Sequence, residues 1–327
     1  MVERWLFRVA SRPEFGGGHV TRCLALAAAM APSASVRFLL DAGGEAWASA
    51  ITEARYAISL DGDWPHTPVD GVVLDHYDPE VADATRWRAV ARRVVAFRDG
   101  GQPVLGVDVE ICPWAKRGTG PTDGSLHGLD FAVVDPSYAA ISNASIEPLP
   151  GRVLVAFGYR DSPNATTRVL EALDRLGAEW SPTVTVALGA NAPNLGSVET
   201  ACDRLGARAR LAVEPDGLQN LLSNCDFAVG AGGVSAAERA AGGRPSLTIT
   251  LNEMQVPAAQ ALAAAGATAD CGLLASLSDE TLDAALMSLA KDTGARAAMA
   301  RAGRRAVDGR GAERIAQRLF QQAPVGG

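Results

Sequence analysis

The sequence contains little cysteine, and its cysteines form no recognisable site. Five cysteines are spread along 327 residues with no Cys-x-x-Cys pair and no Cys/His cluster: Cys23, Cys112, Cys202, Cys225 and Cys271. Zinc sites need such clusters, and disulfide-stapled domains need dense, paired cysteines. We therefore expect no metal site and no disulfide framework, and a reducing cytoplasm fits this cysteine usage best.

The chain also lacks an excess of positive charge and any long apolar run. Its formal net charge is −7, whereas nucleic-acid binding generally needs a basic surface that neutralises phosphates. No run of about 18 apolar residues occurs, and charged residues interrupt the apolar ones within residues 1–8. These absences predict a soluble, cytoplasmic protein with no nucleic-acid partner and no stable membrane insertion.

What the sequence does contain is a regular alternation of apolar, strand-like segments with helical ones. Such alternation is typical of parallel sheets covered by helices on both faces, and the length exceeds that of a usual single domain. The predicted fold class is α/β, with two Rossmann-like doubly wound domains that face a cleft. We place an N-terminal domain at 1–149 and a C-terminal domain at 150–310, with the linker within 136–151. A last helix over 311–322 is expected to brace one domain against the other and can join the first domain.

The individual elements follow from local patterns of apolar residues. In the first half, strands are expected at 5–10, 35–41, 56–60, 69–75, 103–108 and 129–135. A long helix rich in arginine is expected over 80–97. In the second half, strands are expected at 152–157, 183–188, 209–213, 227–229 and 246–250.

A glycine-rich loop connects the first expected strand to the first helix. Residues 15–22 read Phe-Gly-Gly-Gly-His-Val-Thr-Arg, and strongly helix-forming residues follow. Adjacent glycines let the backbone approach a ligand closely, and the free N–H groups of a helix's first turn attract anions. His19 would stand beside such a ligand. The alternative is that the glycines only form a tight turn and that His19 packs against it.

A second glycine-rich loop follows a buried strand in the C-terminal half. There Gly232 and Gly233 precede a helix that contains Ser235 and Glu238. This arrangement predicts a second anion site at a helix N-terminus. Glu238 could accept hydrogen bonds from the two hydroxyls of a ribose, because a carboxylate accepts two donors at once. Its alternative role is that of an acid near the start of a helix, where the helix dipole favours it.

Four stretches in the same order resemble one family over most of the chain. They are FGGGHVTRCLALA, VLDHYD, FGYRDSPNAT and GAGGVSAAERAAGGRPSLTI followed by NEMQ. Together they resemble the UDP-sugar hydrolases of pseudaminic acid biosynthesis, which are themselves similar to glycosyltransferases of the GT-B fold. The resemblance implies metal-independent removal of UDP from a 2,4-diacetamido-2,4,6-trideoxy hexose by water attack at the anomeric carbon. The free sugar would serve nonulosonic acid biosynthesis and glycosylation of a surface or flagellin.

The resemblance also implies roles for individual residues. His19 would be the general base on water, which suits an imidazole because it titrates near neutral pH. Gly232, Gly233 and Ser235 would hold the diphosphate, and Glu238 the ribose. No cofactor is implied, and the expected partner is a nucleotide sugar, with UDP as the nucleotide. The candidates for the sugar site are Gly17, Gly18, Arg22, Asp75, His76, Tyr77, Asp161, Asn164, Glu253 and Gln255.

Three departures from the family's pattern leave the sugar open. Tyr159 stands where a second glycine is usual, Met254 replaces an asparagine, and Val234 replaces a serine or threonine. A different amino sugar or a different nucleotide is therefore an alternative substrate. In other reaction classes, the alternatives are a glycosyltransferase that uses a related donor and an acceptor other than water, and a binding protein without catalysis. A serine hydrolase is disfavoured because the Gly-x-Ser-x-Gly motif is absent. The first loop also lacks the glycine spacing of a dinucleotide-binding dehydrogenase.

Overall fold

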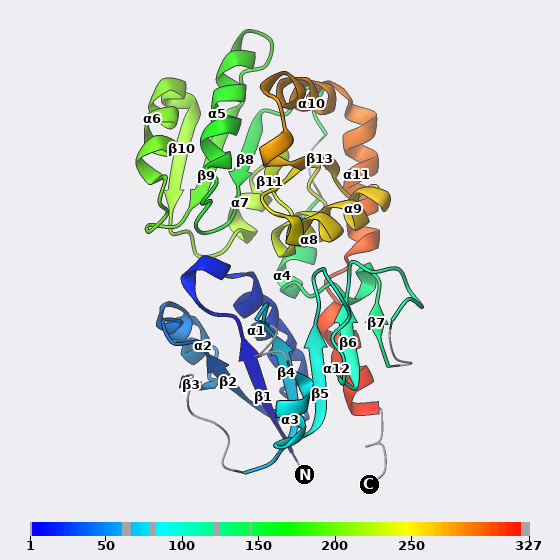
Figure 1. Cartoon of the computed structure of the whole chain (residues 1–327). Coiled ribbons are helices and arrows are strands. Elements are labelled where there is room, and N and C mark those ends of the chain that lie inside the picture. The colour runs from blue at the N-terminus through cyan, green and yellow to red at the C-terminus, as the bar shows by residue number, and fades with distance from the viewer. Residues whose placement is uncertain (1, 61–66, 79–82, 121–123, 144–145, 322–327) are drawn as a thin grey trace. The chain divides into compact units, whose positions relative to one another are not determined.

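The computed structural model describes residues 2–60, 67–78, 83–120, 124–143 and 146–321. These residues form two compact units, shown in Figure 1. The first unit comprises the chain up to Asp135 together with the segment from Arg310 onward, and the second comprises Pro136–Gly309. Each unit is a parallel sheet with helices packed around it, so the predicted α/β class with two doubly wound sheets is confirmed.

The first unit contains a seven-stranded sheet in the order β3-β2-β1-β4-β5-β6-β7, with all neighbouring strands parallel. Its strands are β1 (Glu3–Val9), β2 (Ala34–Leu40), β3 (Ala57–Leu60), β4 (Val69–Asp75), β5 (Ala91–Phe97), β6 (Val109–Cys112) and β7 (Leu126–His127). The strand order reverses direction between β1 and β4. Ligands of such sheets bind beyond the carboxyl ends of the strands at this switch point.

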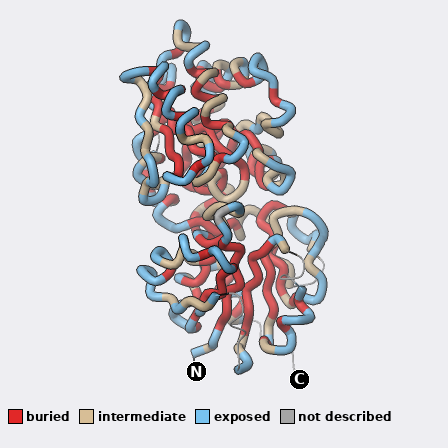
Figure 2. The backbone as a smooth tube through the Cα atoms, turned by 60° about the vertical axis from the view of Figure 1, so that its left-hand side comes forward, coloured by how far each residue is buried: buried red, intermediate tan, exposed pale blue. Residues whose placement is uncertain are grey.

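The second unit contains a six-stranded parallel sheet in the order β10-β9-β8-β11-β12-β13. Its strands are β8 (Arg152–Ala156), β9 (Thr183–Leu188), β10 (Ala209–Val213), β11 (Phe227–Ala231), β12 (Ser246–Thr250) and β13 (Ala269–Leu273). The switch point lies between β8 and β11. Figure 2 shows the central strands of both units as buried, which matches their continuous apolar sequences.

Helices cover the faces of each sheet. In the first unit they are α1 (Gly18–Met30), α2 (Ala48–Glu53), α3 (Ala84–Arg88) and α12 (Gly311–Gln321). In the second unit they are α4 (Pro136–Ala139), α5 (Ala165–Arg175), α6 (Leu195–Leu205), α7 (Gln219–Ser223), α8 (Val234–Ala241), α9 (Val256–Ala264), α10 (Asp279–Lys291) and α11 (Thr293–Ala306). A side-chain cap begins α3, α10 and α11. For example, the Ser278 side chain accepts a hydrogen bond from N of Thr281 at the start of α10.

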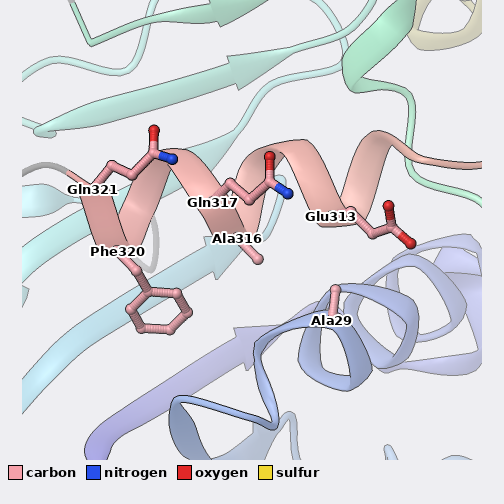
Figure 3. Close-up of a pocket in the computed structure, with 6 residues that line it drawn as sticks. All are labelled: Ala29, Glu313, Ala316, Gln317, Phe320 and Gln321. Carbon is pink, nitrogen blue, oxygen red and sulfur yellow. The ribbon is translucent and has the colours of Figure 1, made fainter.

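The last helix belongs to the first unit. Ile315, Ala316 and Leu319 are buried along one face of α12, at the spacing expected for an amphipathic helix. This face packs against α1, and a pocket of about 340 Å³ opens beside the contact (Figure 3). The residues that line the pocket are Ala29, Glu313, Ala316, Gln317, Phe320 and Gln321. The pocket lies near the C-terminal end of α1, away from the glycine-rich loop at its other end.

The segment expected to be a linker is fixed to the second unit by two buried arginines, Arg244 and Arg296, and by the partly buried Arg304. Arg304 donates to O of Ala139 at 3.0 Å, and Arg244 donates to O of Ser142 at 3.0 Å. Arg296 donates to O of Pro148 at 3.3 Å. A guanidinium offers five donors, so each side chain can hold several loop carbonyls at once. The first unit therefore ends at Asp135, earlier than the boundary at 149 that the composition suggested.

The expectation of a long helix over 80–97 is wrong. Its described part contains the short helix α3, which Asp83 caps by accepting from N of Thr85, and then strand β5. Val94 and Val95 are completely buried within the sheet, and a short apolar run of this kind fits a buried strand as well as a helix. Arg93 accordingly lies on a strand and pairs with Glu3, not on a solvated helix face.

Two further predicted strands are also absent as such. Residues 103–108 are irregular, and the strand at this position in the sheet is β6, which begins at Val109. The segment 129–135 starts with a 3₁₀ turn, η3 (Leu129–Phe131), and continues without pairing in the sheet. Both segments border the edge of the sheet, where pairing is least strongly determined by burial.

Candidate functional site

The first glycine-rich loop lies at the switch point of the first sheet, between the carboxyl end of β1 and the start of α1. Gly16 has φ +72°, a conformation that favours glycine. A Cβ on Gly17 would lie 2.5 Å from the Trp47 ring, so the loop can pass this close only with glycine there. Gly17 begins α1 without a side-chain cap from the described residues, and His19 and Gly18 occupy the first turn. The sequence therefore sets His19 at an open helix N-terminus.

His19 is hydrogen-bonded to Asp75, the last residue of β4. Nδ1 of His19 lies 2.6 Å from Oδ1 of Asp75, and both side chains are buried. An ionised carboxylate only accepts, so Nδ1 carries the proton, and the lone pair of a neutral ring is on Nε2. Nε2 has no hydrogen bond to any described residue and is not enclosed. This arrangement can orient an imidazole so that Nε2 accepts a proton.

Arg22 links Asp75 to a second carboxylate, Asp99, which follows β5. Its Nε and Nη2 lie 2.6 Å from the two oxygens of Asp75, and its Nη1 lies 2.6 Å from Oδ1 of Asp99. Burial alone would raise the pKa of Asp75, but Arg22 and His19 hold it well below its usual range. Burial opposes the charge of Arg22 too, yet the two carboxylates raise its pKa. Arg22 is thus directed into the unit and keeps Asp75 ionised.

Tyr77 forms the solvent side of this cluster. Its ring stands edge-on to the His19 ring, with centroids 4.5 Å apart. Its hydroxyl donates to Oδ2 of Asp99 at 3.3 Å, and 41% of the residue is exposed. The Phe15 ring lies next to Tyr77 with centroids 6.0 Å apart. Tyr77 therefore borders His19, and Phe15 extends the aromatic surface on the far side of Tyr77. Such a surface suits the apolar face of a sugar or another ring.

His76 has a different environment from His19. Its Nε2 lies 3.0 Å from Oδ1 of Asp41, and its Nδ1 accepts from N of Asp78 at 3.0 Å. Asp41 also accepts from N of Ser11 and from Arg8. Both ring nitrogens are occupied, so His76 ties the ends of β2 and β4 together and has no nitrogen to offer a ligand.

Sequence reasoning did not identify Asp99 or Trp114 as part of this cluster. Nε1 of Trp114 donates to Oδ1 of Asp99 at 3.0 Å, the same oxygen that accepts from Nη1 of Arg22. The signal for Asp99 is its position, since a polar residue directly after a central parallel strand lies at the ligand-binding edge of the sheet. Asp99 cannot be recognised in this way from the sequence, because residues 91–97 were expected to be part of a helix and not a strand.

The second glycine-rich loop lies at the switch point of the second sheet, after β11. Gly233 has φ +84°, and Gly232 packs so tightly that a Cβ would lie 3.1 Å from atoms of Gln255 and Thr250. No described side chain caps the N-terminus of α8. The first N–H groups of a helix have no intrahelical acceptor, so this end attracts an anion. Ser235 lies in the first turn.

The other predicted residues of the second unit adjoin this loop or the neighbouring one. Gln255 contacts Gly232, and its Oε1 accepts from N of Leu251 at 2.9 Å. Glu253 is exposed in the 3₁₀ turn η6 (Glu253–Gln255). Glu238, on the second turn of α8, is buried.

Asp161 and Asn164 shape the loop between β8 and α5. The Asp161 carboxylate accepts from N of Ala165 at 2.9 Å and from N of Thr166 at 2.7 Å. Burial raises the pKa of Asp161, and these hydrogen bonds oppose the rise. Asn164 has φ +62° and accepts from the hydroxyl of Thr167. The N-terminus of α5 is thus already neutralised by a carboxylate, which leaves α8 as the open helix end at this switch point.

The described residues contain no group of three or more His, Cys, Asp or Glu side chains placed to hold a metal ion. Nor does any helix in the described ranges have the length and apolar character needed to cross a membrane.

Comparisons with known proteins identify relatives of the sequence and of the fold. No protein-family model matches the chain. It is 26% identical over 199 residues to the spore coat polysaccharide biosynthesis protein SpsG of Bacillus subtilis (strain 168), an alignment that covers 60% of this chain. The chain spans 58% of the length of that relative.

Solved structures of the GT-B type match nearly the whole chain. MurG of Acinetobacter baumannii superposes with a TM-score of 0.69 at 14% identity and covers 98% of this chain and 100% of its own. UDP-GlcNAc 2-epimerase of Neisseria meningitidis, solved with bound UDP-GlcNAc, has a TM-score of 0.69 at 11% identity, with coverage of 98% and 100%. At these identities the likeness establishes the fold. The two-domain GT-B fold that the resemblance implied is therefore confirmed.

Proposed function

We propose that this chain, which resembles the UDP-sugar hydrolases of pseudaminic acid biosynthesis and has the GT-B fold, hydrolyses a UDP-linked diacetamido-trideoxy hexose at the anomeric carbon. The products are UDP and the free sugar. The sugar would enter nonulosonic acid biosynthesis of the pseudaminic type and then glycosylation of flagellin or another surface component. The similarity to a protein of spore coat polysaccharide biosynthesis supports a role in supplying surface carbohydrate.

The observation that carries this proposal is the His19–Asp75 hydrogen bond, which leaves Nε2 of His19 without a hydrogen bond to any described residue. In the proposed reaction, Nε2 takes a proton from water while the water oxygen forms a bond to C1 of the sugar. The bond between C1 and the phosphate oxygen breaks, and its electron pair leaves with UDP. Attack from the face opposite the leaving group inverts the anomeric centre. Asp75 stabilises the imidazolium that forms, as the acid of a catalytic triad does.

The second unit is proposed to bind UDP. Gly232 and Gly233 let the diphosphate approach the backbone, and the N-terminus of α8 with the Ser235 hydroxyl stabilises the charge that grows on the leaving phosphate. Glu238 is proposed to accept hydrogen bonds from the ribose hydroxyls. Tyr77 and Phe15 would contact the sugar beside His19.

The test is UDP release from the diacetamido-trideoxy sugar nucleotide without any acceptor and with a chelator present. Turnover under these conditions is expected. His19→Ala should abolish turnover, since general-base catalysis contributes about 10²- to 10⁴-fold, and should leave the Kd for UDP nearly unchanged. His19→Ala with wild-type turnover would overturn the assignment of the base.

A glycosyltransferase is the second candidate, because proteins named as glycosyltransferases share this fold. One is the spinosyn rhamnosyltransferase SpnG, with a TM-score of 0.63 at 15% identity. The same base could then deprotonate an acceptor hydroxyl in place of water. UDP release that occurs only after an acceptor is added would favour transfer, and equal release with and without an acceptor would favour hydrolysis.

A further inference from the structure

Arg239 is a buried cation directly behind the glycine-rich loop of the second unit. It lies one turn after Ser235 in α8, and only 1% of the residue is exposed. Its Nη2 donates to O of Ala231 at 2.8 Å and to Oγ1 of Thr248 at 3.0 Å, and its Nη1 donates to Oγ of Ser235 at 3.4 Å. A Cβ on Gly230 would lie 2.7 Å from Nη1, so this glycine leaves room for the guanidinium.

No carboxylate of the described residues forms a hydrogen bond or an ion pair with Arg239. The hydrogen bonds of Arg239 to these residues go to one carbonyl and two hydroxyls, and its buried Nε has no partner among them. Burial lowers the pKa of the guanidinium to about 10, and the neighbouring Glu238 opposes this only in part. Burying an ion without a counter-charge is unfavourable even after the protein relaxes. A bound anion would remove part of this cost.

The buried Arg244 and Arg296 and the partly buried Arg304 have evident structural roles in the second unit. Arg244, Arg296 and Arg304 donate to backbone carbonyls of the segment 136–150 and so fix it in place. Arg239 makes no such contact. Its hydrogen bonds reach the loop and helix start where an anion is expected, which sets it apart from the other three.

We propose that Arg239 is a positioning residue that supplies the positive charge for a diphosphate held at the N-terminus of α8. Donation to O of Ala231 polarises the peptide group whose N–H belongs to Gly232, and donation to Oγ of Ser235 polarises that hydroxyl. Both groups become stronger donors at the helix end that attracts anions. The inference rests on the proposed function in one respect, that the anion is the diphosphate of a nucleotide.

The experiment measures Kd values of the full-length chain for UDP, uridine and inorganic pyrophosphate by calorimetry. Arg239→Met removes the charge at similar volume, and Arg239→Lys keeps it. The control, Arg296→Met, removes an equally buried arginine that donates to carbonyls elsewhere in the unit. Arg239→Met should raise the Kd for UDP and for pyrophosphate at least about tenfold, because hydrogen bonds to charged groups contribute this much to binding. The Kd for uridine, which has no phosphate, should change less than about twofold. The Kd values of Arg239→Lys for UDP and pyrophosphate should lie between those of Arg239→Met and those of the wild type.

The ratio of UDP to uridine affinity separates a role in charge from a role in folding. If Arg239 had only a structural role, its removal would lower the affinities for UDP and uridine by the same factor. Arg296→Met should leave the ratio of the two affinities unchanged. An unchanged UDP affinity in Arg239→Met, or equal losses for UDP and uridine, would overturn the inference, as would a wild type that binds neither UDP nor pyrophosphate. If pyrophosphate binding depends on Arg239 but the protein does not turn over the sugar nucleotide, the proposed function is overturned and the inference stands. If the protein turns over the sugar nucleotide but its UDP affinity does not depend on Arg239, the inference is overturned and the proposed function stands.

Discussion

Nδ1 of His19 and Oδ1 of Asp75 lie 2.6 Å apart, although the two residues are 56 positions apart in the sequence. The parallel pairing of β1 with β4 brings them together, because it sets the loop after β1 beside the last residue of β4. The hydrogen bond fixes both the orientation and the tautomer of the imidazole. Its removal is the most direct test of the first unit's chemistry.

Asp75→Asn should lower kcat by about 10²- to 10⁴-fold, because an amide no longer stabilises the imidazolium and can hold the wrong tautomer. Steady-state kinetics of UDP release would measure the change. Binding of UDP should remain within about twofold of wild type, since the proposed nucleotide site lies in the other unit. A kcat within a few-fold of wild type would contradict the role of the pair.

His76→Asn serves as a matched variant for His19. Both histidines bind a carboxylate, but the ring nitrogens of His76 are both engaged within the fold. We expect His76→Asn to reduce the free energy of unfolding by roughly 1–3 kcal/mol and to change kcat by less than about tenfold. Urea denaturation and kinetics on the same preparation measure the two effects. Loss of turnover as complete as that of His19→Ala would show that our separation of the two histidines is wrong.

The Asp75–Arg22 pair predicts how stability changes with acid. The folded-state pKa of Asp75 is lowered, so its contribution is fully present above the unfolded value of about 3.9 and is lost as the pH falls below it. The free energy of unfolding should therefore fall as the pH drops below about 4 in the wild type. In Asp75→Asn this fall should be smaller. Urea titrations at each pH would test this, and identical slopes would contradict it.

Arg22→Met should destabilise the first unit by about 3–5 kcal/mol, because it leaves two buried carboxylates without their shared cation. Without the Arg22 charge, which lowers the pKa of Asp75 in the wild type, burial would raise that pKa. Thermal unfolding measures the loss. The double variant Arg22→Met with Asp99→Asn should recover part of the stability, since one of the unpaired charges is removed. Absence of any recovery would argue against charge as the cause.

Leu319→Ala tests the assignment of α12 to the first unit. Leu319 is buried against the core that includes α1, and truncation of a buried leucine costs roughly 2–5 kcal/mol. The affinity for UDP, proposed for the second unit, should stay within about twofold. Exposed Arg318→Ala is the control on the same helix and should change stability by less than about 0.5 kcal/mol.

The two glycine-rich loops could be predicted because their signal is local. A strand, a run of glycines and a helix start are contiguous in the sequence, and both loops lie at the switch points of their sheets. Asp99 could not be found in the same way. Its strand, β5, carries an apolar run after arginines at helical spacing, and only pairing with β4 and β6 makes it a strand.

The direction of polar side chains was also beyond prediction from the sequence. Arg22 and Asp161 were candidates for the sugar site, yet Arg22 pairs with two carboxylates and Asp161 caps α5. Whether a polar residue beside a loop faces a ligand or the fold depends on partners distant in the sequence, such as Asp99 for Arg22. The domain boundary depended likewise on arginines more than a hundred residues downstream of the segment that they hold.

The first unit is assembled from two ends of the chain, whereas the second is one continuous segment, Pro136–Gly309. During synthesis, strands β1–β7 leave the ribosome first but lack the face of α12 that covers α1. The second unit can complete its core before that helix exists. The second unit should therefore finish folding before the first unit, although the first unit begins to be synthesised earlier. This order is the opposite of the usual tendency for N-terminal domains to fold first. A nascent chain stalled before Arg310 should protect the second unit from protease and leave the first one susceptible.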